Sequence, residues 1–191
     1  MRERVIMPLV PPLGIVGLSF GKHAVEPNPI NQKLAENLDR QAKLMVFVDG
    51  HSAGEKPVVI AQWEIAKAST YDDMTVVDQR DATNVDRGGK SYLDSQDVLN
   101  VAFAEWRAKR VTDVIVIAHP FLHKPAVEKM VRQAGFNVIK HRVPFPGFDN
   151  SPDALQWWCK GPIRFVAYLV IQVVGKVLNK NLHGIGEKRA P

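Results

Sequence analysis

Short runs of apolar residues alternate along this chain with longer stretches in which apolar residues recur every three or four positions. The short runs are typical of strands buried on both faces of a parallel sheet, and the longer stretches are typical of helices packed on such a sheet. The clearest run covers residues 114–118, four of which are Val or Ile. It predicts a central strand whose carboxyl end leads into a loop containing His119, Pro120 and His123.

The remaining runs and stretches predict strands at residues 13–19, 44–48, 75–77 and 136–143, and helices at 30–43, 57–68, 94–106 and 125–134. This alternation predicts an α/β fold: a single-domain, three-layer Rossmann-like sandwich with a mostly parallel sheet of about five strands. Asn28 and Pro29 predict the start of the first helix, Asp94 caps the third, and Gly135 ends the fourth. We expect one domain over residues 1–191, with a proline-rich lead-in (1–12) and a basic flexible tail (179–191).

Residues 163–178 form a strongly apolar segment near the C-terminus, and Gln172 is the one interruption between residues 165 and 174. That core is too short to cross a bilayer, which needs about 20 apolar residues, so we expect no integral membrane segment. The favoured interpretation is a terminal helix packed on the sheet. A strand, a homo-oligomer interface and a membrane-surface contact remain the alternatives.

Composition narrows the class of protein. The chain has 191 residues, of which 46% are hydrophobic and 24% charged, as in soluble globular proteins. The single cysteine, Cys159, excludes an internal disulfide and a cysteine-rich zinc site, and its surroundings do not predict a reactive thiol. A cytoplasmic protein is expected, with envelope association as the alternative. The prolines within residues 5–20 and the absence of a cleavage site argue against a signal peptide there.

The formal net charge is +5, and the last sixteen residues carry +3 of it. The imbalance therefore lies mostly in the C-terminal tail rather than across one face of the domain. Nucleic-acid binding requires basic residues interleaved with aromatic ones along a groove, and this pattern is missing. We expect no nucleic-acid partner.

Polar and glycine-rich segments follow the predicted strands, and in open α/β sheets ligands bind at the carboxyl ends of the strands. After the first strand, glycines allow the backbone to approach a ligand and a lysine supplies positive charge. The segment after the predicted strand 44–48 would meet it at the same edge. The candidate ligand-binding residues of these two segments are Gly17, Ser19, Gly21 and Lys22, then Asp49, Gly50 and His51. Their glycine spacing does not match the dinucleotide-binding fingerprint.

His119 and His123 are the candidate catalytic residues. Their spacing of four would place both rings on one face of a helix and suggests a metal pair, with His51 or Asp49 as a third ligand. Prolines beside both histidines argue against a continuous helix, so no metal site is expected. We instead expect one histidine to act in the cleft as an acid, base or hydrogen-bond donor, and the other to make a structural hydrogen bond.

Four further residues are candidates for ligand binding. Glu64 lies in the second predicted helix, where it would accept hydrogen bonds from ligand hydroxyls or simply face solvent. Ser95 and Asp97 open the third helix, where capping is a sufficient alternative explanation. Lys124 follows the histidine loop and would neutralise an anionic ligand.

The order of these segments resembles the YdcF/SanA/ElyC-like family, a Rossmann-like family of unknown function. The similar segments are D-G-H at 49–51, A-Q-W-E-I-A at 61–66, Y-L-D-S-Q-D-V at 92–98 and V-P-F-P at 143–146. Gly50 corresponds to one of two glycines in the family's Ser-Gly-Gly motif, and Glu64 to its helix glutamate. Ser95 and Asp97 occupy the Thr and Glu positions of its Thr-x-Glu-Asn motif.

The chain also departs from the family pattern. Val98 replaces the Asn of Thr-x-Glu-Asn. In the His-x-x-Arg-Ala motif, Ala126 aligns with the closing alanine, but Leu122 and Pro125 then replace the histidine and arginine. A shift of one residue restores the histidine as His123 and places Lys124 near the arginine position.

The resemblance implies a Rossmann-like fold, and some family members are linked to the bacterial envelope. One is reported to bind S-adenosylmethionine, which makes that compound a candidate cofactor here. The expected function is binding of a nucleotide-like or anionic small molecule, as an enzyme or as a binding protein. The alternative is a noncatalytic envelope-associated or assembly protein that uses residues 163–178 and the basic tail.

Overall fold

The computed structural model describes residues 11–21, 26–48, 56–85, 91–154 and 156–177. The strands are β1 (Gly14–Gly17), β2 (Val58–Gln62), β3 (Met74–Val77), β4 (Asn84–Val85), β5 (Ser91–Tyr92), β6 (Asp113–Ile117) and β7 (Asn137–Val138). The α-helices are α1 (Pro29–Val48), α2 (Trp63–Ala68), α3 (Ser95–Ala108), α4 (Lys124–Gln133) and α5 (Pro162–Val177). Two short 3-10 helices complete the elements, η1 (Gln79–Asp81) and η2 (Trp157–Cys159).

Five parallel strands form the main sheet, in the order β3-β2-β1-β6-β7. The order runs outward from β1 to β3 on one side and continues with β6 on the other, so the topology reverses between β1 and β6. In doubly wound sheets the crevice outside the carboxyl ends at such a switch point is where ligands bind. The predicted α/β fold and the mostly parallel five-stranded sheet are confirmed.

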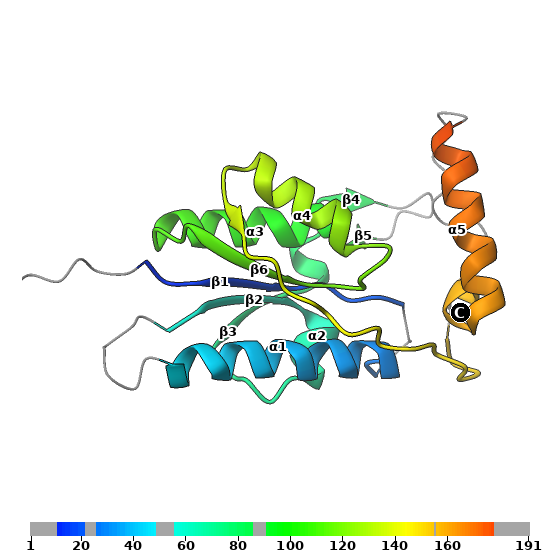
Figure 1. Cartoon of the computed structure of the whole chain (residues 1–191), viewed down its shortest axis with the longest axis horizontal. Coiled ribbons are helices and arrows are strands. Elements are labelled where there is room, and N and C mark those ends of the chain that lie inside the picture. The colour runs from blue at the N-terminus through cyan, green and yellow to red at the C-terminus, as the bar shows by residue number, and fades with distance from the viewer. Residues whose placement is uncertain (1–10, 22–25, 49–55, 86–90, 155, 178–191) are drawn as a thin grey trace, which may run out of the picture.

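Helices cover both faces of the sheet, with α1 and α2 on one face and α3 and α4 on the other (Figure 1). Successive strand residues point to opposite faces and so enter two separate cores. In β6, for example, Val114 and Val116 pack with α3 and α4, whereas Ile115 and Ile117 pack with α1. All four side chains are buried, which explains the unbroken apolar run that predicted this strand.

The predicted strand at residues 44–48 is wrong, because α1 continues through these residues to Val48. The apolar positions Ile30, Leu34 and Leu38 lie on one buried face of this helix, as their spacing predicts. No glycine or proline separates that face from the run at 44–48, so the helix has no reason to stop. The second strand is instead Val58–Gln62, within the segment expected to be helical. Its Val-Val-Ile run is buried on both faces, and the helix is confined to Trp63–Ala68.

The starts and ends of α3 and α4 match the sequence prediction. Asp94 caps α3 by accepting hydrogen bonds from the backbone amides of Gln96 and Asp97. Asp97 completes a capping box by accepting from the Asp94 amide. Gly135 follows α4 at a φ of +94°, a conformation that favours glycine after a helix.

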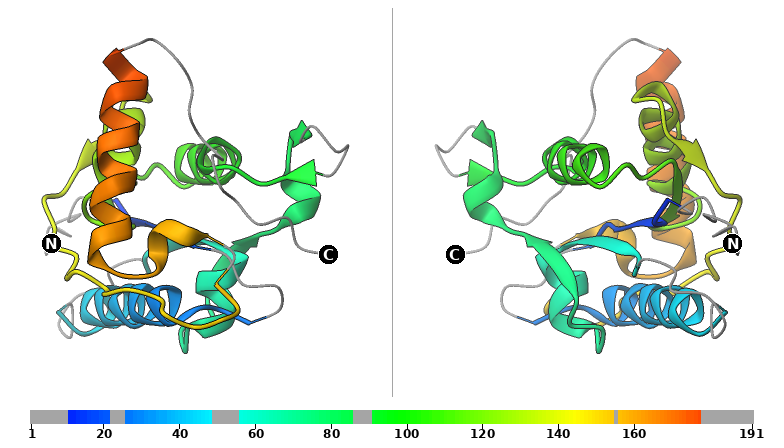
Figure 2. Two further views of the ribbon diagram at one scale, coloured as in Figure 1. Left: turned by 90° about the vertical axis from the view of Figure 1, so that its right-hand side faces the viewer. Right: turned by 90° about the vertical axis from the view of Figure 1, so that its left-hand side faces the viewer.

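The chain after α4 differs most from expectation. The predicted strand at 136–143 forms a ladder only at Asn137–Val138, and an extended segment then returns along the sheet to its carboxyl edge (Figure 1). There α5 stands beyond the strand ends instead of packing on a sheet face, as the turned views show (Figure 2). The prediction of a helix is correct, but the prediction that it packs on the sheet is wrong. Within the described ranges, no helix combines the length and hydropathy that crossing a bilayer requires.

Candidate functional site

The loops after β1 and β6 meet at the switch point. The two strands pair in register up to Gly17 and Ile117, and the Leu18 amide then donates a hydrogen bond of 2.9 Å to the Ile117 carbonyl. This pairing brings the residues after β1 beside His119, which lies just past β6. The predicted neighbourhood of the site is therefore assembled by adjacent parallel strands.

Two buried asparagines hold the turn after β1. The Asn28 side chain donates a hydrogen bond of 2.9 Å to the Phe20 carbonyl. It also accepts a hydrogen bond of 2.8 Å from the backbone amide of Asn31, as expected of the predicted N-cap of α1. Asn31 accepts 2.7 Å from the Phe20 amide. Gly21 has a φ of +78°, and a Cβ there would lie 2.6 Å from the Asn28 amide nitrogen. The turn therefore requires glycine for both its conformation and its packing.

His119 is 1% exposed, and its Nδ1 has no hydrogen-bond partner. Its ring is stacked on Phe20, with centroids 4.1 Å apart and an angle of 27° between the planes. Burial, with a smaller contribution from the charge on His123, lowers the pKa of His119 to about 3. The imidazole is therefore neutral at physiological pH and presents one donor and one acceptor nitrogen.

Phenylalanines surround His119 and form what we call the aromatic cluster: Phe20, Phe121, Phe145, Phe148 and Phe165. Phe165 comes from the first turns of α5 and lies 5.3 Å from the His119 ring, centroid to centroid. Phe145 comes from the returning segment and lies 5.6 Å away. Phe121 and Phe145 are 62% and 42% exposed. His119 thus lies under a cover of aromatic rings, two of which face solvent.

His123 sits at the N-cap position of α4, where its ring meets Phe20 edge-on at 5.2 Å. The two histidines therefore contact different sides of one phenylalanine. Across the described ranges, His, Cys, Asp and Glu side chains do not gather in groups of three that could hold a metal ion. Of the two, His119 is the one buried at the switch point.

Ser19 and Glu64 approach the same edge from neighbouring strands. Ser19 is buried, and its amide donates a hydrogen bond of 3.1 Å to the side-chain oxygen of Gln62 at the end of β2. Glu64 follows two residues later in the first turn of α2 and is 5% exposed. The carboxylate is therefore inside the protein rather than in solvent. A buried glutamate is costly and marks this region as a polar one within the core.

Packing explains Gly17, and contacts within the protein explain Lys124. A Cβ on Gly17 would lie 2.6 Å from the Leu38 side chain, so this glycine allows α1 to approach β1. The ammonium of Lys124 is largely buried, donates to the His141 carbonyl and lies 3.7 Å from Glu128. Burial lowers the pKa of Lys124, against a smaller opposing effect of Glu128. These contacts hold the returning segment against α4. They also pair the ammonium of Lys124 within the protein, whereas the sequence predicts that it neutralises an anionic ligand.

Ser95 and Asp97 lie at the start of α3. Asp97 is 2% exposed and accepts hydrogen bonds from Asp94 and from the amide and hydroxyl of Thr83. Burial raises the pKa of the Asp97 carboxyl, but these hydrogen bonds outweigh it, so the pKa lies below its usual value. Ser95 is the first residue of the helix and is partly exposed. Capping thus accounts for Asp97, the alternative that the sequence offered.

The other predicted site residues, Lys22, Asp49, Gly50 and His51, lie outside the described residues. The last three were expected at the carboxyl edge because residues 44–48 were expected to be a strand. Since those residues belong to α1, the reason for that placement no longer holds.

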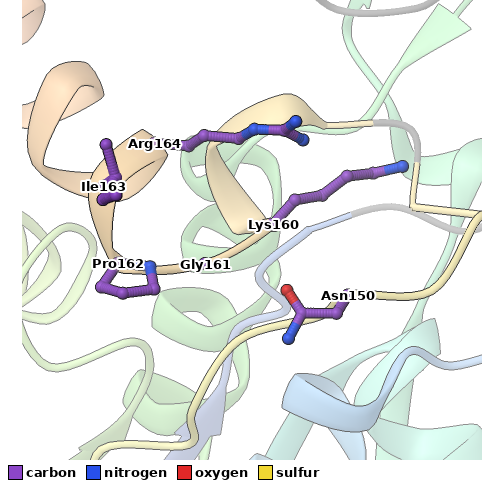
Figure 3. A pocket seen from close by; sticks show the side chains of 6 residues that line it. All are labelled: Asn150, Lys160, Gly161, Pro162, Ile163 and Arg164. Atoms are coloured by element: carbon purple, nitrogen blue, oxygen red, sulfur yellow. The ribbon is translucent and has the colours of Figure 1, made fainter.

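A shallow pocket of about 440 Å³ lies at the start of α5, lined by Asn150, Lys160, Gly161, Pro162, Ile163 and Arg164 (Figure 3). The side chains of Lys160 and Arg164 extend to the same side of the chain there. The pocket adjoins the turn of α5 that delivers Phe165 to His119. It adds two cationic side chains to this edge of the molecule.

Sequence reasoning missed the residues that build the cover and the turn: Phe20, Asn28 as a clamp, Asn31, Phe145 and Phe165. The phenylalanines carry a weak signal, since Phe145 lies in a proline-rich stretch and Phe121 beside the histidines. Their convergence depends on contacts between residues about 100 positions apart, such as Phe20 and His119, which a local pattern does not encode.

The fold and this edge define the class of protein: an α/β domain with a Rossmann-like parallel sheet and a buried histidine at its switch point. Comparison with models of known families, with curated proteins and with solved structures gives no match.

Proposed function

We propose that this domain binds a small, planar, nucleotide-like molecule at the switch point between β1 and β6, with His119 as its hydrogen-bonding partner. The observation that carries the proposal is the buried Nδ1 of His119, which has no partner. Leaving such a nitrogen buried costs about 1–3 kcal/mol, which a ligand that bonds to it would offset.

The location supports the same conclusion. His119 lies at the carboxyl end of β6, directly beside the loop after β1, where doubly wound sheets bind their ligands. A purely structural role would be served better by a phenylalanine, because the ring would keep its stacking on Phe20 and bury no polar atom.

The surroundings favour a planar ligand over a compact anion. The cluster offers aromatic faces at the exposed Phe121 and Phe145, and bases stack on such faces. Lys124, the cation expected to hold an anion, is engaged with His141 and Glu128. Neutral His119 can hydrogen-bond the edge of a heterocycle. The ligand reaches it by displacing the two exposed rings, and S-adenosylmethionine is a candidate through the family resemblance.

A ligand panel tests the proposal. Thermal unfolding of the full chain is measured with nucleotides, nucleosides, nucleotide sugars and S-adenosylmethionine, in the natural protein and in His119→Phe. We expect one class of compound to raise the melting temperature of the natural protein and to raise that of His119→Phe much less. A response that His119→Phe retains in full would overturn the role of His119. No response to any compound would overturn the proposed ligand class.

His141→Phe is the matched control. His141 is a second partly buried histidine, and its Nε2 lies 3.1 Å from the side-chain oxygen of Asn37. It lies on the returning segment and not at the switch point, so its replacement should leave the ligand response intact. Equal loss in both variants would indicate a general effect of losing a histidine.

A further inference from the structure

The outer face of α5 carries half of the large exposed hydrophobic side chains of the described residues. Ten such side chains are exposed, and five of them belong to this one helix: Ile163, Val166, Val170, Val173 and Val174. Ile163 is 85% exposed and the four valines 46–61%. Phe121 and Phe145, at the same carboxyl edge, are two more. Exposed apolar residues gathered in this way mark an interaction surface, whereas scattered ones do not.

The five residues form one stripe. At about 100° per residue they fall within an arc of about 100° on the helix. The opposite side of α5 holds the helix to the protein: Phe165 and Tyr168 are buried, and Tyr168 stacks on Trp158 with centroids 4.5 Å apart. The stripe therefore faces away from the side of α5 that contacts the protein. The helix itself stands beyond the strand ends (Figure 1).

The charged residues of α5 are all basic. The sequence of α5 contains Arg164 and Lys176 and no Asp or Glu. Lys160 lies just before the helix, and its side chain extends beside that of Arg164 (Figure 3). The fourteen residues that follow α5 in the sequence add Lys180, Lys188 and Arg189 against Glu187.

We propose that the outer face of α5 docks on an anionic membrane surface, with the apolar stripe entering the boundary between headgroups and acyl chains. A helix of this kind lies in the plane of the interface, with its cationic side chains at the level of the anionic headgroups. Each Lys or Arg near such a surface adds electrostatic attraction. The helix does not span the bilayer, and the sheet remains outside it.

Charge complementarity favours an anionic membrane over a second copy of the chain as the partner of the stripe. Pairing two α5 helices along their stripes would bring their Arg and Lys residues together, with no carboxylate on either helix to neutralise them. An anionic surface neutralises all of them at once. A second copy is therefore an alternative outcome of the test.

Vesicle binding tests the proposal with the full chain. Co-sedimentation is measured with vesicles of phosphatidylcholine alone and of phosphatidylcholine mixed with phosphatidylglycerol, at low and high salt. We expect binding to the mixed vesicles, little to the neutral ones, and loss at high salt. Reversing the charges in Lys160→Glu/Arg164→Glu should weaken binding about tenfold or more.

The stripe is tested with Val166→Glu/Val170→Glu, which should abolish binding while the protein stays folded, since both side chains already face solvent. Leu44→Glu is the matched control, because Leu44 is 46% exposed on α1, and its change should leave binding intact. Circular dichroism and thermal unfolding confirm that each variant is folded. Absence of vesicle binding by the natural protein overturns the proposal. If sedimentation velocity then shows a dimer that Val166→Glu/Val170→Glu dissociates, the occupant is a second copy.

Discussion

The imidazole of His119 lies stacked on the ring of Phe20, with centroids 4.1 Å apart and 27° between the planes. Each ring follows one of the two strands that flank the switch point, so the stack lies at the carboxyl edge of the sheet between them. Two hydrogen bonds fix Phe20 in turn: its carbonyl accepts from the Asn28 side chain, and its amide donates to the Asn31 side chain. One half of the stack is thus anchored to α1, and the other half directly follows β6.

The protein should lose stability as the pH falls below about 6.5. The pKa of His119 falls from an ordinary 6.5 to about 3 on folding, mainly through burial. The unfolded chain therefore binds a proton between these values that the folded protein does not, and stability falls as pH drops from about 6.5 toward 3. His141, whose pKa burial also lowers, adds to the same trend. We expect a loss on the order of a few kcal/mol, measured by urea unfolding across this range.

His119→Phe is the control for this prediction. The variant keeps an aromatic ring on Phe20 and has no group to titrate, so its stability should vary less with pH above about 4. Below that value Asp39 and Asp97, whose pKa values are lowered in the fold, should destabilise both proteins alike. Equal slopes in the two proteins between pH 6.5 and 4 would show that His119 does not have a lowered pKa.

Replacing Gly21 with alanine should destabilise the protein by about 2–4 kcal/mol, through backbone strain at a φ of +78° and a clash with Asn28. Gly135→Ala provides a matched control. Gly135 also has a positive φ, +94°, but a Cβ there would have nothing within 4 Å. Only the strain of about 1 kcal/mol should remain. Denaturant unfolding measures both, and equal costs would contradict the tight packing around Gly21.

The thiol of Cys159 should be inert in the folded protein. It is 1% exposed, and burial, with a smaller effect of Asp149, raises its pKa to about 12. The reactive thiolate is therefore scarce at pH 8, and reagents have no access to it. Reaction with a disulfide reagent should be slow in buffer and fast in denaturant. Fast modification of the folded protein would show that the region near η2 opens readily.

Asp97→Ala should cost about 1–2 kcal/mol, because it removes half of the capping box of α3 and leaves Thr83 without its acceptor. Gln96→Ala, at the exposed neighbouring position, should change stability by less than about 0.5 kcal/mol. If Asp97 binds ligand as well, Asp97→Asn should lower the ligand response of the folded protein. An unchanged response together with lower stability assigns Asp97 to capping alone.

The sequence by itself determined the features that depend on neighbours in the chain. The β-branched run at 114–118 predicts β6 as an interior strand, which lies between β1 and β7. Asp94 and Asn28 mark helix starts through hydrogen bonds within three residues. The parallel sheet follows from the alternation of such elements. His119 could be placed at a strand end because β6 is unambiguous.

Tertiary structure decided what local pattern leaves open. The run at 44–48 suits a strand or a helix, and the continuing turns of α1 settle it. Apolar residues in α5 look the same in sequence whether they enter a core or face outward. Among the side chains of this helix that the structure describes, Phe165 and Tyr168 are the buried ones. The aromatic cover over His119 draws rings from the loops after β1 and β6, from the returning segment and from α5. Such long-range packing has no periodicity in the chain, so the structure alone brings these rings together.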